Sequence, residues 1–174
     1  MSDPRRPAYK LTAYWLALLT PAALLGGALV SQYLFGLAPC EMCWWQRYPH
    51  GAALVLGLAA FAMRSDWLVR LAALAIMVSG AIGGYHAGVE YGWWEGLTRC
   101  ATGALANGDP LASIMNAPVI RCDVAPWSLL GISLAGWNFL ISGAAGIAIL
   151  ALLGRRSAQA SPTLPGQQIG GITA

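Results

Sequence analysis

The chain has 174 residues, of which 57% are hydrophobic and only 10% charged, with a formal net charge of +3. Soluble domains carry about 25% charged residues, so this composition excludes a disordered chain, a nucleic-acid-binding module and an ordinary soluble enzyme. The length is that of one domain, and the mean hydropathy of +0.59 indicates a membrane protein.

Four apolar stretches are long enough to cross a bilayer core, which takes about 20 helical residues. They cover residues 11–37, 44–63, 67–89 and 127–153. The stretches are continuously apolar rather than alternating, which favours helices over the strands of a barrel. We therefore expect an all-α membrane protein, a four-helix transmembrane bundle. It would form a single domain over residues 1–156, followed by a disordered cytoplasmic tail at 157–174.

The first stretch follows basic residues, as the apolar part of a signal peptide does, but it is longer than such a segment and three more stretches follow it. We therefore interpret it as a retained helix. With four spans both ends of the chain lie on one side. That side carries Arg5, Arg6, Lys10, Arg64, Arg70, Arg155 and Arg156, whereas the other side carries only Arg47, Arg99 and Arg121. The positive-inside rule then places both termini in the cytoplasm.

The outer side has two connections, a short one at about residues 38–43 and a long one at about residues 90–126. In the long one, Asp109 and Pro110 have the pattern of an N-cap and first residue of a helix. Leu111, Ile114 and Met115 then fall on one face. This pattern predicts a short horizontal helix lying on the membrane surface.

All four cysteines fall on the outer side, as two pairs: Cys40 with Cys43, and Cys100 with Cys122. An oxidising compartment would preserve disulfides there, and four cysteines allow three pairings, of which this one fits the spacing best. Closing the longer loop would stabilise the fold by about 3.4 kcal/mol and the shorter by about 2 kcal/mol. A structural role thus explains Cys100–Cys122 adequately and Cys40–Cys43 poorly. A Cys-x-x-Cys pair is more often a redox pair or half of a metal site.

Arg47 follows Cys43 by four residues, so the two share a helix face one turn apart. A guanidinium there, together with the helix N-terminus, favours the Cys43 thiolate. The alternative is that Arg47 extends to the lipid head groups. His86 lies near the outer end of the third stretch and could donate a hydrogen bond to a carbonyl of a bound cofactor, or bond only to water. His50 follows Pro49 and could merely satisfy backbone groups that this proline frees.

A zinc site is the competing interpretation, with Cys40, Cys43, His50 and His86 as ligands. His50 lies about two helical turns deeper than Cys43, and the thiolates would have to survive an oxidising compartment. We therefore expect no metal.

The chain resembles the DsbB family of bacterial disulfide bond formation proteins over about residues 10–153. The segment 39–47, Pro-Cys-Glu-Met-Cys-Trp-Trp-Gln-Arg, is similar to the family signature Pro-Cys-x-x-Cys-x-x-Gln-Arg. The resemblance extends to Tyr85-His86, to Cys100 and Cys122, and to the Trp-Ser-Leu-Leu-Gly segment at 127–131.

This resemblance implies a four-helix bundle in the bacterial inner membrane, with the cysteine loops in the periplasm. It implies an enzyme that reoxidises a periplasmic thioredoxin-fold oxidase of the DsbA type and passes the electrons to ubiquinone or menaquinone bound near Cys43. Cys100 would form the mixed disulfide with the partner, and Cys122 would exchange with Cys40. Cys43 would be the thiolate facing the quinone, with Arg47 stabilising it and His86 lining the same site.

Two alternatives remain open from the sequence. One is an oxidase of the same chemistry that serves a single dedicated partner. The other is a structural scaffold whose outer loop is stapled by Cys100–Cys122. A scaffold does not need Cys40, Cys43 and Arg47 together, so these three residues separate the two classes.

Overall fold

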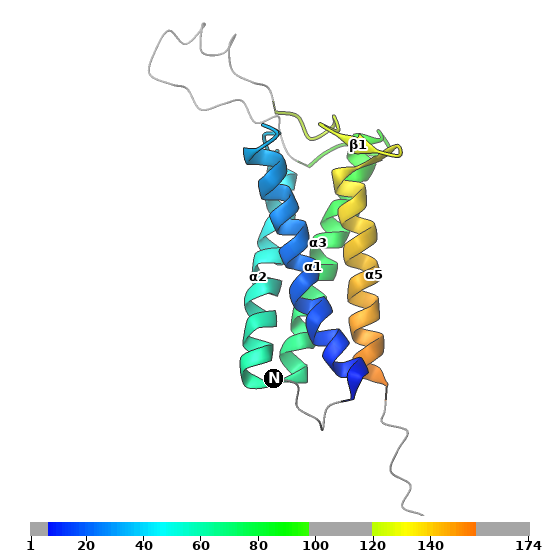
Figure 1. Cartoon of the computed structure of the whole chain (residues 1–174). Helices are drawn as coiled ribbons and strands as arrows, with labels where there is room; N and C mark the ends of the chain where they lie inside the picture. The colour runs from blue at the N-terminus through cyan, green and yellow to red at the C-terminus, as the bar shows by residue number, and fades with distance from the viewer. Residues whose placement is uncertain (1–6, 98–119, 156–174) are drawn as a thin grey trace, which may run out of the picture.

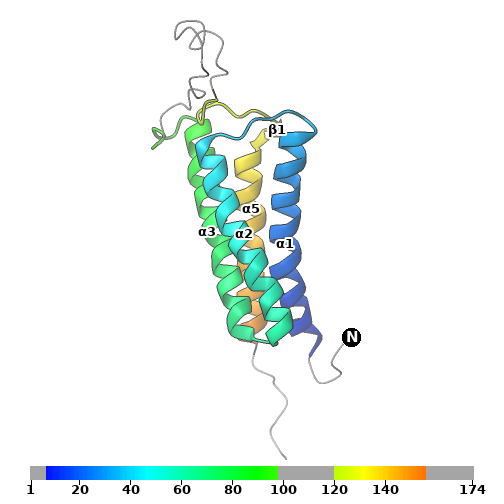
Figure 2. The same cartoon turned by 90° about the vertical axis from the view of Figure 1, so that its left-hand side faces the viewer.

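The computed structural model describes residues 7–97 and 120–155, and four long helices run side by side through it (Figure 1). They are α1 (Ala8–Tyr33), α2 (Glu41–Met63), α3 (Asp66–Glu90) and α5 (Leu134–Gly154). The start of α1 and the end of α5 lie at one end of the bundle, and the start of α2 lies at the other (Figures 1 and 2). The all-helical prediction is therefore confirmed. The horizontal helix predicted near Asp109 falls outside the described residues, as does the tail at 157–174.

Three of the helices, α1, α3 and α5, are long and apolar enough to cross a membrane. Their large apolar side chains in mid-helix, such as Leu19, Val78 and Ile147, are exposed on the outside of the bundle, as lipid-facing residues are. The first half of α2 is less apolar because it carries Gln46, Arg47 and His50. A fourth span in α2 therefore stays a prediction.

The helix ends differ from the predicted spans at two places. α1 ends at Tyr33 rather than near residue 37, and Gly36 follows it with a φ of 69°. The fourth helix starts at Leu134, not at residue 127, so that boundary of the prediction is wrong. The intervening residues form a small antiparallel hairpin of β1 (Ser128–Leu129) and β2 (Ile132–Ser133).

The hairpin is built by its turn and by one tyrosine of α3. Leu130 and Gly131 both have positive φ, 55° and 77°, as a two-residue type I′ turn requires. The Tyr91 hydroxyl donates to the Gly131 carbonyl and accepts from the Ser133 amide, each at 3.1 Å. Ser133 in turn caps α5 through Gly136. These bonds hold the start of α5 beside the end of α3.

Small residues let the helices approach closely in the lower part of the bundle. The core there is made largely of alanines from α1, α2 and α3, with Ile76, Ile149 and Leu153. Close approach extends to the upper end, where a Cβ on Gly83 would lie 2.8 Å from the Ala135 carbonyl oxygen, so only glycine fits at that contact of α3 with α5. Gly143 has open space around it and has no such role.

The upper end of the bundle is different, because buried polar side chains replace the alanines. Gln46 and His50 come from α2, Ser79 and His86 from α3, and Asn138 and Ser142 from α5. Above them lies a second apolar cluster that contains Cys40, Met42, Val89 and Cys122. The fold thus brings most of the sequence-predicted residues to one end.

Candidate redox site

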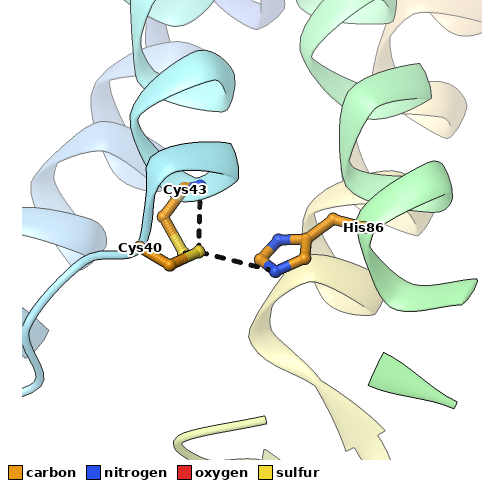
Figure 3. Close-up of side chains that lie close together, drawn as sticks. All are labelled: Cys40, Cys43 and His86. Carbon is orange, nitrogen blue, oxygen red and sulfur yellow. Dashed lines mark hydrogen bonds between the residues drawn. The ribbon is translucent and has the colours of Figure 1, made fainter. Parts of the chain in front are cut away.

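The start of α2 positions the Cys-x-x-Cys pair. Cys40 is the N-cap of the helix, and its Sγ accepts a hydrogen bond from the Cys43 amide at 3.3 Å. The two Sγ atoms lie 3.0 Å apart, with the Cys40 thiol donating to Cys43 (Figure 3). A bond between them would need little backbone movement, because a disulfide joins sulfurs about 2.05 Å apart.

The proton of the pair is held on Cys40. The hydrogen bond to Cys43, and next the burial of the side chain, raise the pKa of Cys40 to about 12. Cys40 therefore stays a thiol at neutral pH, and a negative charge on the pair resides on Cys43. The role of Cys43 as the reactive thiolate, expected from the sequence, stays a prediction.

This difference predicts selective alkylation of the reduced protein. At pH 8, iodoacetamide is expected to modify Cys43 well before Cys40, because only thiolates react and Cys40 is protonated and only 4% exposed. The Cys40 rate should rise as the pH approaches 12, and it should rise at once in denaturant, where the hydrogen bond and burial are lost. Peptide mass spectrometry after timed quenching measures both rates; equal rates in the folded protein would contradict the assignment.

His86 faces the pair from α3. Its Nε2 lies 3.6 Å from Cys40 Sγ (Figure 3). It also lies 3.7 Å from the Glu90 carboxylate, one turn further along the helix. Its Nδ1 lies 2.9 Å from Gln46 Nε2. The ring is therefore held between a sulfur on one side and an amide on the other.

Backbone carbonyls fix which His86 nitrogen carries the proton. Asn138 Nδ2 lies 3.1 Å from the Ser79 carbonyl, and Gln46 Nε2 lies 3.2 Å from the Met42 carbonyl. A carbonyl only accepts, so both amide nitrogens are donors as assigned. Gln46 Nε2 then donates to His86 Nδ1, and the ring proton lies on Nε2, toward Cys40. His86 is a hydrogen-bond donor to the sulfur and not a base that could take its proton.

Arg47 is enclosed by protein rather than extended to solvent. Its guanidinium donates to Gln32 Oε1 at 2.5 Å and to the Ala28 carbonyl at 3.1 Å, both on α1. It also lies 4.8 Å from the centre of the Trp44 ring. Two α1 contacts and a cation–π contact hold the charge near the start of α2.

Two cavities meet at the cysteine pair. The larger, of about 480 Å³, lies among α1, α2, α5 and the loops above them, and its polar lining includes Cys43, Arg47, His86 and Glu90. The smaller, of about 260 Å³, is lined by Cys40, Cys43 and His86 and by residues 120–126. Cys40 does not line the larger cavity, and Arg47 does not line the smaller. Cys43 therefore borders both cavities, whereas Cys40 borders only the smaller one.

The second cysteine pair is described only in part. Cys122 is 8% exposed and packs in the apolar cluster of Cys40. Beside it, the Arg121 guanidinium bonds to Asp123 and lowers the pKa of that carboxyl. Cys100 lies outside the described residues. The structure thus places Cys122 in one cluster with Cys40, and Cys43 packs against the same cluster.

The zinc interpretation does not assemble as a four-ligand site. The ligand atoms of Cys40, Cys43 and His86 lie within 4.8 Å of one another, close enough to approach one ion. His50 is not among them, and its Nε2 is bonded to Asn138 Oδ1 at 2.9 Å. A structural zinc almost always takes four ligands.

The comparisons with known proteins point the same way as this geometry. The sequence profile described as "Disulfide bond formation protein DsbB" matches residues 10–152. The chain belongs to the DsbB family. A disulfide bond formation protein B of Verminephrobacter eiseniae is 36% identical over 80% of this chain and 85% of its own length. Proteins of the same name from Chromohalobacter salexigens and an Azoarcus species are 33% and 32% identical, over 79% and 78% of this chain and 84% and 87% of theirs. No solved structure matches.

Membership of the DsbB family makes the chain a membrane disulfide bond formation protein and suggests a disulfide oxidoreductase of the inner membrane. Sequence reasoning did not find Glu90, Asn138 or Ser79 as parts of its site. An amide within an apolar stretch, as Asn138 is, was the one available signal, because polar groups at membrane depth need partners.

Proposed function

We propose that the chain reoxidises a periplasmic thioredoxin-fold oxidase of the DsbA type and passes the electrons to a membrane quinone. One observation carries the proposal: Cys43 lines the larger cavity and Cys40 does not, while Cys40 is buried in the cluster that contains Cys122 and Cys43 is only partly buried against that cluster. Disulfide exchange with a second cysteine pair and electron transfer to an apolar oxidant require two cysteines with different neighbours. A scaffold protein would need neither.

Each exchange step conserves electrons. The dithiol of the partner reduces the Cys100–Cys122 disulfide, Cys100 forming the mixed disulfide, and the partner leaves oxidised. Cys122 then attacks Cys40, so the Cys40–Cys43 bond breaks and Cys43 is released as a thiolate. Cys100 completes the exchange by displacing Cys40. Two thiols remain on Cys40 and Cys43, and their two electrons and two protons are the ones to be removed.

The larger cavity fits a quinone head group. Its volume of about 480 Å³ is within the usual range of ligand sites, and its lining is mostly apolar with a few polar groups. Cys43, Arg47 and His86 would hold ubiquinone or menaquinone there. When bound, a quinone supplies a two-electron, two-proton acceptor. Arg47 contributes a fixed positive charge beside Cys43, and the His86 N–H stabilises negative charge on Cys40 during exchange.

The proposal includes the predicted topology. Four spans within residues 1–156 would place both termini in the cytoplasm and both cysteine loops in the periplasm. The basic residues support this: in the part of the chain that the structure describes, Lys10, Arg64, Arg70 and Arg155 lie at the end of the bundle away from the cysteine pair. α2, with its buried Arg47, would cross the bilayer with its polar face toward the other helices.

The test is quinone reduction by the purified protein in detergent, supplied with a reduced DsbA-type partner and followed by quinone absorbance. We expect reduction of ubiquinone or menaquinone that disappears when Cys40, Cys100 or Cys122 is replaced by serine. Folded protein that reduces neither quinone with this partner would contradict the proposal. It would favour the scaffold or a dedicated partner.

A further inference from the structure

His50 has a free nitrogen at the larger cavity. The side chain is 3% exposed and lines this cavity, one turn beyond Arg47 on α2. Its Nε2 is bonded to Asn138, but its Nδ1 has no hydrogen-bond partner among the described residues. A buried polar atom without a partner is costly, so this nitrogen marks a place where a ligand group can bind.

The hydrogen-bond network decides what this nitrogen can bind. Asn138 Nδ2 donates to the Ser79 carbonyl and to Gln46 Oε1, so Asn138 Oδ1 can only accept. It accepts from Ser142 Oγ at 2.8 Å and from His50 Nε2 at 2.9 Å. The proton of the neutral His50 ring is therefore on Nε2. Nδ1 carries a lone pair and is a hydrogen-bond acceptor.

Donor and acceptor alternate along the wall of the cavity. Cys43, Arg47 and His50 follow one another at spacings of four and three residues, so they form one stripe on α2. All three line the cavity. Arg47 can only donate, and His50 Nδ1 accepts. Glu90 Oε2, also buried at this cavity, has no partner among the described residues either.

We propose that His50 makes this cavity selective for a ring that carries a hydroxyl group, and hence for the reduced, dihydroxy form of a quinone over the oxidised dione. The inference rests on the proposed function and names the form of the ligand that the site prefers. A hydroxyl can accept from Arg47 and donate to His50, whereas a carbonyl oxygen can only accept and leaves His50 unpaired. Preferential binding of the reduced form shifts the equilibrium in the site toward reduced quinone and oxidised cysteines.

Direct binding of redox-inert probes tests this selectivity without turnover. The probes are a 4-methoxyphenol carrying a decyl chain and the 1,4-dimethoxybenzene with the same chain, titrated into the detergent-solubilised protein by calorimetry. The wild type is expected to bind the phenol about tenfold more tightly, the worth of one hydrogen bond. In His50→Leu the two dissociation constants should become equal, mainly through weaker phenol binding. His50→Gln keeps an acceptor oxygen and should retain most of the preference.

In His50→Leu, Asn138 Oδ1 still accepts a hydrogen bond from Ser142. His50→Gln is the control that distinguishes a specific loss of phenol binding from a general loss of folding. Equal binding of both probes by the wild type would overturn the selectivity and leave the proposed function standing. An unchanged preference in His50→Leu would overturn the role of His50. If the folded wild type binds neither probe, the cavity is not the quinone site, and this part of the proposed function fails as well.

Discussion

Replacing Cys43 with serine is expected to abolish quinone reduction while leaving capture of the partner intact. Cys43 is the only cysteine that lines the larger cavity among residues 7–97 and 120–155, and the serine hydroxyl cannot become the thiolate that gives up electrons. In the proposed scheme, capture uses Cys100 and Cys122, which the substitution does not touch. The rate of quinone reduction should fall at least a thousandfold.

The two activities are measured separately on the same preparation. Quinone absorbance reports reduction. Non-reducing electrophoresis reports the mixed disulfide, formed with a DsbA-type partner that keeps only its attacking cysteine. Cys100→Ser is the matched control, because it should lose the mixed disulfide as well. Normal turnover by Cys43→Ser would remove Cys43 from its assigned place.

Helix positions were predictable because hydropathy is a local property of the chain. α2 and α3 start and end within three residues of the predicted spans. The start of the fourth helix was not predictable in this way. The apolar residues from Trp127 to Ser133 fit a helix by hydropathy, yet they form a hairpin because Tyr91, about 40 residues earlier, binds its turn. A contact between distant segments leaves no periodic signal.

The residues of the site were likewise predictable only where the signal is local in the sequence. The sequence placed Arg47 on the face of Cys43, and both side chains do line one cavity. It gave no reason to connect His86 with Gln46, Asn138 and Ser79, since these come from three helices and each is a single polar residue in an apolar stretch. Hydropathy averages such residues away. Only their hydrogen-bond geometry reveals that the two histidines hold their protons on fixed nitrogens.

Replacing Arg47 with alanine is expected to lower kcat/KM for quinone at least tenfold. The substitution removes a buried positive charge, leaves Gln32 Oε1 without its donor and removes one of the donors to the Ala28 carbonyl, which still accepts from Ser31 Oγ. A hydrogen bond to a charged group is worth about 1.5–3 kcal/mol, which corresponds to roughly a tenfold to hundredfold change. Steady-state kinetics with varied quinone at a saturating concentration of reduced partner measures the effect.

Two further variants separate the position of the charge from its presence. Arg70→Ala removes an equal charge from an exposed site at the other end of α3 and should leave the quinone kinetics unchanged. Arg47→Lys keeps the charge but cannot bond to two α1 oxygens with a planar fork, so its kcat/KM should fall between those of the wild type and the alanine variant. An unaltered quinone dependence in Arg47→Ala would return this arginine to a purely structural contact between α1 and α2. The ordering of the three variants therefore tells whether the charge that α1 holds in place acts on Cys43 and on the ligand of its cavity.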